Sequence, residues 1–389
     1  MEPRVPPASS QSSPEGLDGY LGRMLRMRAS DLFLRAGSPP SYRVDGRIVR
    51  TDLPAPSARD METYVEHLLT PVARERFRTC PDVDVAYKAE GIGRFRINIF
   101  SHQGALGIAA RGIPPGAVEF DTLNLPASVL EMAGAPSGLI LVVGPTGSGK
   151  STTLASLVHH INATRPAHII TIEDPIEFVH DEIQALIHQR QVGFDTESFA
   201  RALRHVVRQS PDVIMIGEMR DADTMQTAIS AALTGHLILT TLHTTSVVQS
   251  INRILNYFPA EARAQAQTDL ATTLVGMVSM RLLPRKDAPG RVPACEVLKG
   301  TPTARGLIAE GRFVELYDLM KRSRDVGMTT LNQSLVDLCR EGAVAEQIAL
   351  ACAPNPDEFR LNIQGMFTGI DSIDLRARRR DDEDDTDAG

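Results

Sequence analysis

Four short segments in the middle of the chain contain only apolar or β-branched residues, and longer amphipathic segments separate them. Such uninterrupted runs are typical of strands that helices cover on both faces. We therefore expect a mostly parallel sheet with strands at 139–143, 169–172, 213–216 and 237–241. The segments between them favour helices at 151–161, 196–208 and 222–233, with Asp195 as the cap of the second.

Shorter strands with frequent turn residues precede this region. A helical pattern at 20–25 and a helix at 58–69 accompany strands expected at 32–34, 42–44, 47–49, 83–87 and 94–100, with a hairpin at Asp45-Gly46. The pattern predicts an α+β domain over 19–111. The GIPPG segment at 112–116 stops both strand and helix propagation, which predicts a hinge linker over 112–122.

The two ends of the chain differ from the interior. Residues 1–18 contain four prolines and four serines and are expected to form a disordered leader. After an α/β core at 123–289, residues 290–366 are expected to form a small helical domain. The segment 367–389 joins a basic run at 376–380 to an acidic run at 381–387, which indicates a solvated tail or, alternatively, a docking tail for a partner.

Composition excludes several classes of partner. The net charge is −7, from 41 basic and 48 acidic residues, so no overall positive field favours nucleic acid. The four cysteines form no C-x-x-C pair and are expected to be free thiols rather than zinc ligands. No apolar run approaches the length of a membrane span, and the N-terminus has no basic-then-apolar signal. We expect a cytoplasmic protein without direct membrane insertion.

The strand expected at 139–143 ends in the glycine-rich sequence GPTGSGKST. Three glycines let the backbone turn tightly with its N–H groups pointing inward, and the following helix adds the positive end of its dipole. This spacing predicts a phosphate-binding loop in which Lys150 reaches the β- and γ-phosphates and Ser151 completes the coordination of Mg²⁺. The predicted nucleotide-binding residues are Gly144, Pro145, Thr146, Gly147, Ser148, Gly149, Lys150, Ser151 and Thr152.

Polar residues follow the other predicted strands, where ligands of open parallel sheets gather. DVIMIGE, at 212–218, is typical of a Walker B strand, whose Glu218 would hold Mg²⁺ through water. TIEDPIEF, at 171–178, contains Glu177, our candidate for the group that positions the attacking water. The neighbouring Glu173 and Asp174 remain alternatives for that role.

Two histidines and three arginines are further candidates. His236 and His243 flank the strand at 237–241 and are predicted to sense the γ-phosphate through hydrogen bonds, with a structural role as the alternative. Hydrolysis also favours an arginine supplied by another subunit. Arg94, Arg96 and Arg111 of the first domain are the candidates, and an ordinary salt bridge is the alternative for each.

Four motifs in order resemble the Walker A, Asp box, Walker B and His box of the PilT/PilU family of secretion ATPases. They are GPTGSGKSTTLA at Gly144, TIEDPIEF at Thr171, SPDVIMIGEMRDADTM at Ser210 and TGHLILTTLHT at Thr234. The resemblance extends over about 20–366 through SDLFLRAGSPP and GIGRFRINIF. It implies a PAS-like domain, a RecA-like ATPase core and a helical C-terminal domain in a hexameric ring. Such ATPases use ATP to retract type IV pili in twitching motility, at the cytoplasmic face of the inner membrane.

The resemblance also implies roles for single residues. It assigns phosphate binding to Lys150, catalysis to Glu177 and Glu218, the His-box positions to His236 and His243, and action on a neighbouring subunit's nucleotide to Arg94, Arg96 and Arg111. Two departures point away from PilT: Gly104 replaces a further arginine, and TARGLIAEG at Thr303 replaces AIRNLIRE. ELYDLMKRSRDVGMTTLNQSL at Glu315 is more similar to PilU, which implies an accessory role beside a PilT-type ATPase and an inner-membrane pilus platform protein.

Three other functions are weighed against this one. A pilus-assembly or type II secretion ATPase usually carries a tetracysteine zinc module and a larger N-terminal region, which this sequence lacks. A regulatory subunit that binds ATP without turnover, within a mixed motor, is opposed by the presence of Lys150, Glu177 and Glu218. A DNA-translocating motor would need a basic surface interleaved with aromatic residues, which the sequence does not show.

Overall fold

The computed structural model describes residues 16–44, 46–113, 116 and 119–366. Most of the predicted leader, Asp45 of the predicted hairpin and the whole charged tail lie outside these residues. The leader was predicted to reach residue 18, but helix α1 begins at Leu17, which is buried in the first core. The chain divides into two compact units, which we describe separately. One comprises the residues up to Pro115 together with Glu177–Val179, and the other comprises Gly116–Ile176 and the residues from His180.

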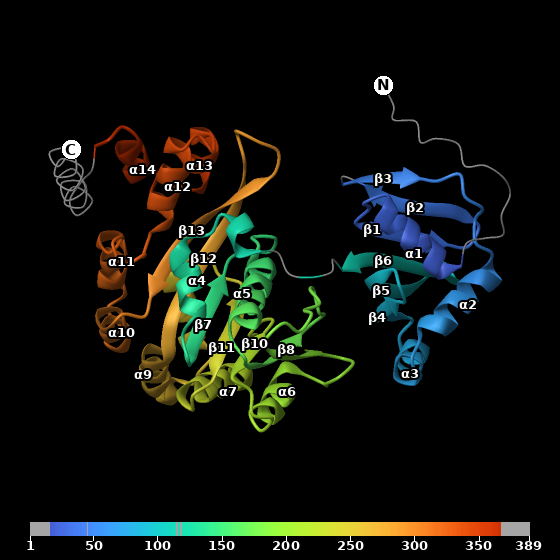
Figure 1. The fold of residues 1–389 in the computed structure, drawn as a ribbon, viewed down its shortest axis with the longest axis horizontal. Helices are drawn as coiled ribbons and strands as arrows, with labels where there is room; N and C mark the ends of the chain where they lie inside the picture. The colour runs from blue at the N-terminus through green and yellow to red at the C-terminus, as the bar shows by residue number, and fades with distance from the viewer. Residues whose placement is uncertain (1–15, 45, 114–115, 117–118, 367–389) are drawn as a thin grey trace. The chain divides into compact units, whose positions relative to one another are not determined.

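The first unit is a six-stranded antiparallel sheet in the order β3-β2-β1-β6-β5-β4, with helices α1, α2 and α3 (Figure 1). Alternating residues of β1 and β5, such as Leu32 and Phe95, point into its core. The elements are α1 Leu17–Arg26, β1 Asp31–Arg35, β2 Ser38–Val44, β3 Arg47–Arg50, α2 Ala58–Leu68, α3 Pro71–Thr79, β4 Asp82–Ala89, β5 Gly93–His102 and β6 Ala105–Ile113.

Helix α3 and strand β6 were not predicted. Helix α3 is rich in arginine and weakly apolar, which hides it from a hydrophobic pattern. Strand β6 extends two residues into the segment predicted as hinge, because Gly112 and Ile113 pair with Phe95 and Arg94 of β5. Cross-strand hydrogen bonds, which no local pattern reports, therefore decide where this strand ends.

The second unit is a seven-stranded sheet in the order β13-β12-β7-β11-β10-β8-β9. Strands β12 and β13 pair antiparallel and the other pairs are parallel. Helices α4 and α5 cover one face, and α6 to α11 pack on the other (Figure 1). Its strands are β7 Gly138–Val143, β8 His168–Glu173, β9 Leu186–Gln191, β10 Val213–Ile216, β11 Leu237–Leu242, β12 Leu274–Pro284 and β13 Arg291–Lys299.

The predicted α/β architecture is confirmed, together with all four central strands. Its helices are α4 Ala127–Ala133, α5 Lys150–Thr164, α6 Phe199–Val206, α7 Ala222–Leu233, α8 Val247–Asn256, α9 Arg263–Thr273, α10 Pro302–Ala309 and α11 Phe313–Arg322, with short 3-10 turns at Phe120–Leu123 and Ala260–Ala262. None of the helices in the described part of the chain is long and apolar enough to cross a membrane.

Two local predictions in this unit were wrong. Helix α6 begins at Phe199 with Ser198 as its cap, whereas Asp195 accepts a hydrogen bond of 2.8 Å from the Gln191 backbone and closes the preceding turn. Residues 291–299, expected within the helical domain, form β13, because antiparallel pairing with β12 extends the sheet. The helical region therefore begins at α10, after one more core strand.

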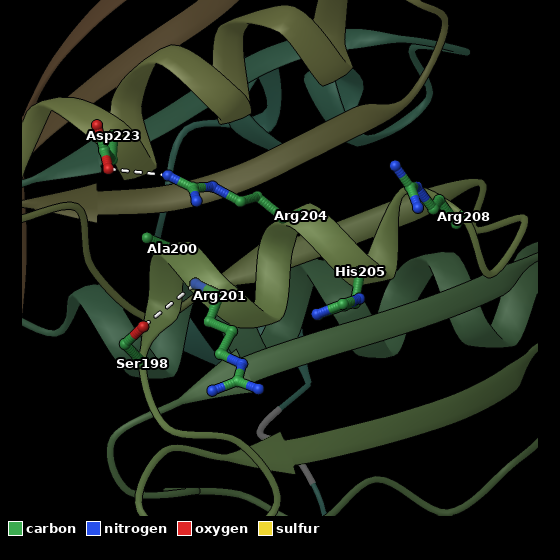
Figure 2. Close-up of a pocket in the computed structure, with 7 residues that line it drawn as sticks. All are labelled: Ser198, Ala200, Arg201, Arg204, His205, Arg208 and Asp223. Atoms are coloured by element: carbon green, nitrogen blue, oxygen red, sulfur yellow. Dashed lines mark hydrogen bonds and ion pairs between the residues drawn. The ribbon is translucent and has the colours of Figure 1, made fainter.

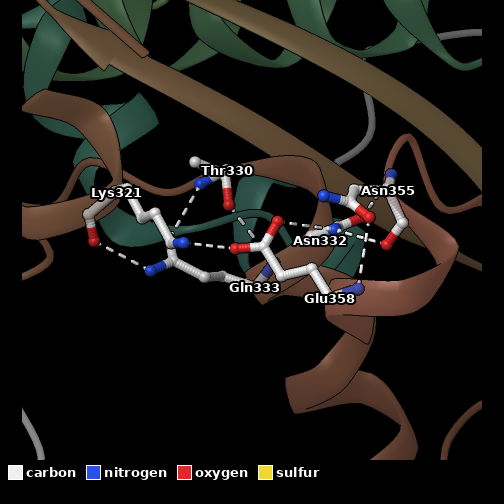
Figure 3. A network of polar contacts seen from close by, with 6 residues as sticks. All are labelled: Lys321, Thr330, Asn332, Gln333, Asn355 and Glu358. Carbon is white, nitrogen blue, oxygen red and sulfur yellow. Dashed lines mark hydrogen bonds and ion pairs between the residues drawn. The ribbon is translucent and has the colours of Figure 1, made fainter. Parts of the chain in front are cut away.

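The last helices enclose a small core of their own against β12 and β13. They are α12 Leu331–Arg340, α13 Glu346–Cys352 and α14 Pro356–Ile363. A polar network joins them to α11: Lys321 forms an ion pair with Glu358, whose other oxygen accepts a 3.2 Å hydrogen bond from Asn332 (Figure 3). Both charged side chains are at least 85% buried, so this pair fixes the helices specifically.

Candidate active site

The glycine-rich loop closes tightly around the end of β7. A Cβ atom on Gly144 would lie 2.5 Å from both the Met280 carbonyl oxygen and Ser148 Oγ, so only glycine fits there. Gly147 and Gly149 have φ angles of 77° and 98°, which side-chain-bearing residues rarely adopt. Helix α5 begins directly afterwards, at Lys150. The loop therefore directs its backbone N–H groups and a helix amino end at one point.

Lys150 and Ser148 lie inside this loop. The Lys150 ammonium group is buried and donates hydrogen bonds of 3.0 Å to the carbonyl oxygens of Gly144 and Pro145. The Ser148 hydroxyl is buried without a hydrogen-bond partner among the described residues. A buried cation beside an unsatisfied donor fits an anionic oxygen ligand, as a phosphate would supply. Ser151 and Thr152 follow on α5, both half-buried.

Glu218 lies two residues beyond β10, at the same carboxyl edge of the sheet. The flanking backbone is tied to both neighbouring strands, because Gly217 donates to Ile172 at 2.8 Å and Met219 to Thr241 at 3.2 Å. The Glu218 side chain is 15% exposed, forms an ion pair with Arg220, and lies 3.4 Å from His243 Nε2. A fixed carboxylate in this position is suited to hold Mg²⁺ through water, together with Ser151.

The electrostatics of His243 connect it to the loop. Burial lowers its pKa, the Lys150 charge lowers it further, and Glu218 acts in the opposite direction. The imidazole is therefore neutral at neutral pH and retains one N–H donor and one acceptor nitrogen. Arg253 of α8 donates a 3.2 Å hydrogen bond to the His243 carbonyl oxygen. Lys150, Glu218 and His243 thus form one cluster at the end of β7, β10 and β11.

His236 lies at the opposite edge of the sheet. It precedes β11, where its carbonyl oxygen accepts a hydrogen bond of 3.0 Å from Gly138 at the start of β7. Its Nδ1 lies 2.9 Å from the Ala231 carbonyl oxygen. The six residues of β11 separate it from His243 by about 20 Å. Because a strand places its two flanks at opposite edges, His236 does not join the cluster of Lys150, Glu218 and His243 in the same chain, and its role in sensing the γ-phosphate stays a prediction.

The three acidic residues at and beyond the end of β8 differ in burial. Glu173 is buried and accepts hydrogen bonds from Thr171 Oγ1 at 2.7 Å and Gln189 Nε2 at 3.2 Å. Asp174 and Glu177 are both exposed. Satisfied, buried acceptors such as Glu173 usually stabilise a fold. The catalytic role of Glu177 stays a prediction.

The three arginines of the first unit lie on the sheet face opposite its core. Arg96 and Arg111 are cross-strand neighbours on β5 and β6, and Arg94 is on the same face of β5. Arg96 forms an ion pair of 3.4 Å with Asp84, and Arg111 one of 2.8 Å with Asp31. These ion pairs are the ordinary salt bridges that the sequence left open as the alternative to a role at a neighbouring subunit's nucleotide. Arg111 is still 68% exposed, so pairing does not bury its guanidinium group.

Several polar residues lie outside the set to which the sequence assigned a role. Arg220 follows Glu218 in the sequence, and its pKa is raised chiefly by its hydrogen bond with Glu218. Three basic residues of helix α6, and Arg208 just after it, line a cavity of about 540 Å³, where Arg204 pairs with Asp223 at 2.9 Å (Figure 2). The spacing of these residues along the chain was a signal available in the sequence. The cavity residues are Ser198, Ala200, Arg201, Arg204, His205, Arg208 and Asp223.

Comparison with known proteins agrees with this geometry. Residues 117–345 match the family model of type II/IV secretion system proteins. The chain is 39% identical to the type IV pilus retraction ATPase PilT of Pseudomonas aeruginosa over 331 residues, 85% of this chain and 96% of PilT. It is 40% identical to the type IV pilus ATPase PilU of the same organism over 341 residues, 88% of this chain and 89% of PilU.

The chain belongs to the PilT/PilU family of secretion ATPases. A solved structure of the pilus retraction motor PilT with bound ADP superimposes with a TM-score of 0.83 at 40% identity, covering 88% of this chain and 98% of that one. The predicted RecA-like ATPase fold and the activity of an ATP hydrolase are thereby confirmed. Nearly equal identities to PilT and PilU do not separate these two branches of the family.

Proposed function

We propose that this chain is a motor subunit that hydrolyses Mg²⁺-bound ATP in a ring of six copies and acts as the accessory, PilU-type ATPase of type IV pilus retraction. It works at the cytoplasmic face of the inner membrane, on the pilus platform protein, beside a PilT-type ATPase. The cluster of Lys150, Glu218 and His243 at one sheet edge carries the motor part of this proposal.

The distribution of the proposed site residues between the two units of the chain supports a ring. The second unit supplies Lys150 for the phosphates, and Ser151 and Glu218 for Mg²⁺, while Glu177 is our candidate for positioning the attacking water. Phosphoryl transfer gains further stabilisation from an arginine next to the γ-phosphate. The first unit offers Arg94, Arg96 and Arg111 on a sheet face, where a neighbouring subunit's nucleotide would be within their reach. A complete site would then need two copies of the chain.

Helix α10 supports the accessory role. The PilT motif AIRNLIRE corresponds to Thr303–Glu310 here, so an asparagine and an arginine become Gly306 and Ala309. Both positions are exposed on α10, whereas Ala304 and Ile308 face the core. The substitutions therefore remove two polar side chains from a surface and leave the fold intact. A surface that PilT uses for retraction would be lost, and retraction would depend on a PilT-type partner.

A retraction assay tests the accessory role. The chain is expressed in two bacterial strains. The first lacks only the gene that encodes this chain, and the second also lacks the gene for the PilT-type ATPase. We expect retraction to improve only in the first strain. Restored retraction in the second strain would overturn the accessory role and make the chain an autonomous motor.

Purified protein tests the motor itself. Light scattering in ATP-containing buffer should give a mass of about 250 kDa, as expected for six chains of 42.3 kDa. ATP turnover should accompany this species. A monomer without turnover would contradict the motor proposal independently of the retraction result.

A further inference from the structure

Glu296 is a buried acid in the middle of strand β13, outside every motif described above. Its side chain is 3% exposed. Pairing of the strands places it beside Ser279 of β12. Ser279 pairs with Val143 of β7, and Val143 pairs with Leu242 of β11. This row crosses the sheet and includes the residues that directly precede the phosphate loop and His243. Paired side chains in such a row share one face, here the face covered by α8.

Glu296 and Ser279 hold the backbone at the amino end of α8. The N–H group of Val247, the first residue of the helix, donates a hydrogen bond of 3.1 Å to Glu296 Oε2. The Ser279 hydroxyl donates one of 3.2 Å to the Thr245 carbonyl oxygen. A helix amino end has unpaired N–H groups and a partial positive charge, so it provides a donor and a favourable field for a carboxylate. The peptide groups on both sides of Ser246 are thus attached to one row of the sheet.

The segment that these contacts hold is short and carries His243. Only three residues separate His243 from Val247. Within it, Thr244 shares a hydrogen bond with Ser250 of α8, and the His243 carbonyl oxygen accepts one from Arg253. A shift of the α8 amino end would therefore move His243 away from Glu218, its partner at 3.4 Å.

We propose that Glu296 is a positioning residue for ATP hydrolysis: its carboxylate holds the amino end of α8 on β13 and so keeps His243 beside Glu218. This inference rests on ATP turnover at the proposed site and is independent of the role in pilus retraction. Glu296 touches no reacting atom and acts only through the position of His243.

The charge of Glu296 depends on its surroundings. Burial raises its pKa to about 7, while the Val247 N–H group and the Arg281 charge oppose this change. Arg281 faces it from β12, and Tyr317 faces it from α11, where burial and nearby carboxylates raise the tyrosine pKa. The ionised carboxylate is the stronger acceptor for the α8 N–H group. Turnover should therefore rise as pH increases through about 7, and this rise should disappear without the carboxylate.

Two conservative variants of the full chain test the inference. Glu296→Gln keeps the shape and an acceptor oxygen but removes the charge. Glu358→Gln is the matched control, because this carboxylate is also largely buried but contacts Lys321 and Asn332 rather than α8 (Figure 3). Hydrogen exchange of the peptide at 243–250 should increase in Glu296→Gln and remain unchanged in Glu358→Gln. Equal exchange in both variants and the parent protein would overturn the inference.

Kinetics then separate positioning from a general structural effect. We expect Glu296→Gln to lower kcat about tenfold, as expected when a charge-assisted hydrogen bond becomes neutral, with little change in KM. In a His243→Ala background the same substitution should change kcat less than about twofold, because the two residues act through one position. A full tenfold loss in that background would overturn the role through His243.

Two outcomes of these experiments, a variant that does not fold and a parent protein without turnover, need their own interpretation. If Glu296→Gln does not fold, Ser279→Ala replaces it, since Ser279 holds the same segment through Thr245; unchanged exchange and kcat in that variant would contradict the inference. If the parent protein has no turnover, the proposed motor function fails. The exchange experiment still decides whether Glu296 holds α8.

Discussion

Glu296 also makes the stability of the folded protein depend on pH in an unusual direction. Its pKa rises from the ordinary value of 4.5 to about 7 on folding, because burial penalises the charged form. Between these values the folded protein retains a proton that the unfolded chain releases. Rising pH therefore reduces this residue's contribution to the free energy of unfolding, whereas most paired carboxylates have the opposite effect.

The expected magnitude follows from the same two values. About 1.4 kcal/mol accompanies each tenfold change in proton affinity, so the interval from 4.5 to 7 corresponds to roughly 3 kcal/mol. Only part of this change in the free energy of unfolding falls within a pH range that is convenient for unfolding experiments. Between about pH 5 and about pH 7.5 the wild-type protein should lose about 2 kcal/mol relative to Glu296→Gln, which cannot ionise.

Urea unfolding followed by circular dichroism measures this difference when both proteins are compared at the same pH. Gly306→Ala is the control: Gly306 is exposed on α10 and an added Cβ meets no atom within 4 Å. This change should stabilise by about 0.5 to 1 kcal/mol at both pH values, because it involves no proton. The reasoning would be refuted if the free energy of unfolding of wild type, relative to that of Glu296→Gln, stayed constant or increased as pH rises.

Three further predictions concern the nucleotide site. Lys150→Ala should weaken ATP binding tenfold to over a hundredfold, since a charge-assisted hydrogen bond contributes about 1.5 to 3 kcal/mol; unchanged affinity in a fluorescent-nucleotide titration would contradict it. Glu218→Gln should bind ATP but not turn it over, and normal steady-state turnover would place catalysis elsewhere. Gly144→Ala should destabilise the protein by about 1 to 3 kcal/mol, because its Cβ would lie 2.5 Å from the Met280 carbonyl oxygen; an unchanged Tm would show that the loop relaxes.

The central strands and the phosphate loop were predictable because their signals are local. A buried parallel strand needs an apolar run, and the loop after β7 needs glycines at fixed offsets before Lys150. Helix α7 was predicted with its observed limits, 222–233, since Asp221 caps it and apolar residues recur at the helical spacing. These features depend on neighbours within a few residues along the chain.

Strands β9 and β13, the start of α6 and the end of β6 were not predictable in this way. Strand β9 reads LIHQRQ, a mostly polar segment that becomes a strand because it pairs with β8 at the edge of the sheet. Strand β13 is fixed by its antiparallel pairing with β12. Hydrogen bonds between distant segments supply the free energy in both cases, and single-segment patterns do not contain them.

For the site, the sequence alone determined which residues are candidates for the chemistry: Lys150, Ser151 and Glu218 follow from motif spacing. Only the tertiary structure decided which candidates meet. It brings His243 to Glu218 and leaves His236 at the other edge, because a strand separates its two ends by its full length. It also brings Glu296 to the start of α8, a contact between residues 49 positions apart that no motif could reveal. Chemistry is encoded in residue types, whereas proximity is created by the packing of distant strands and helices.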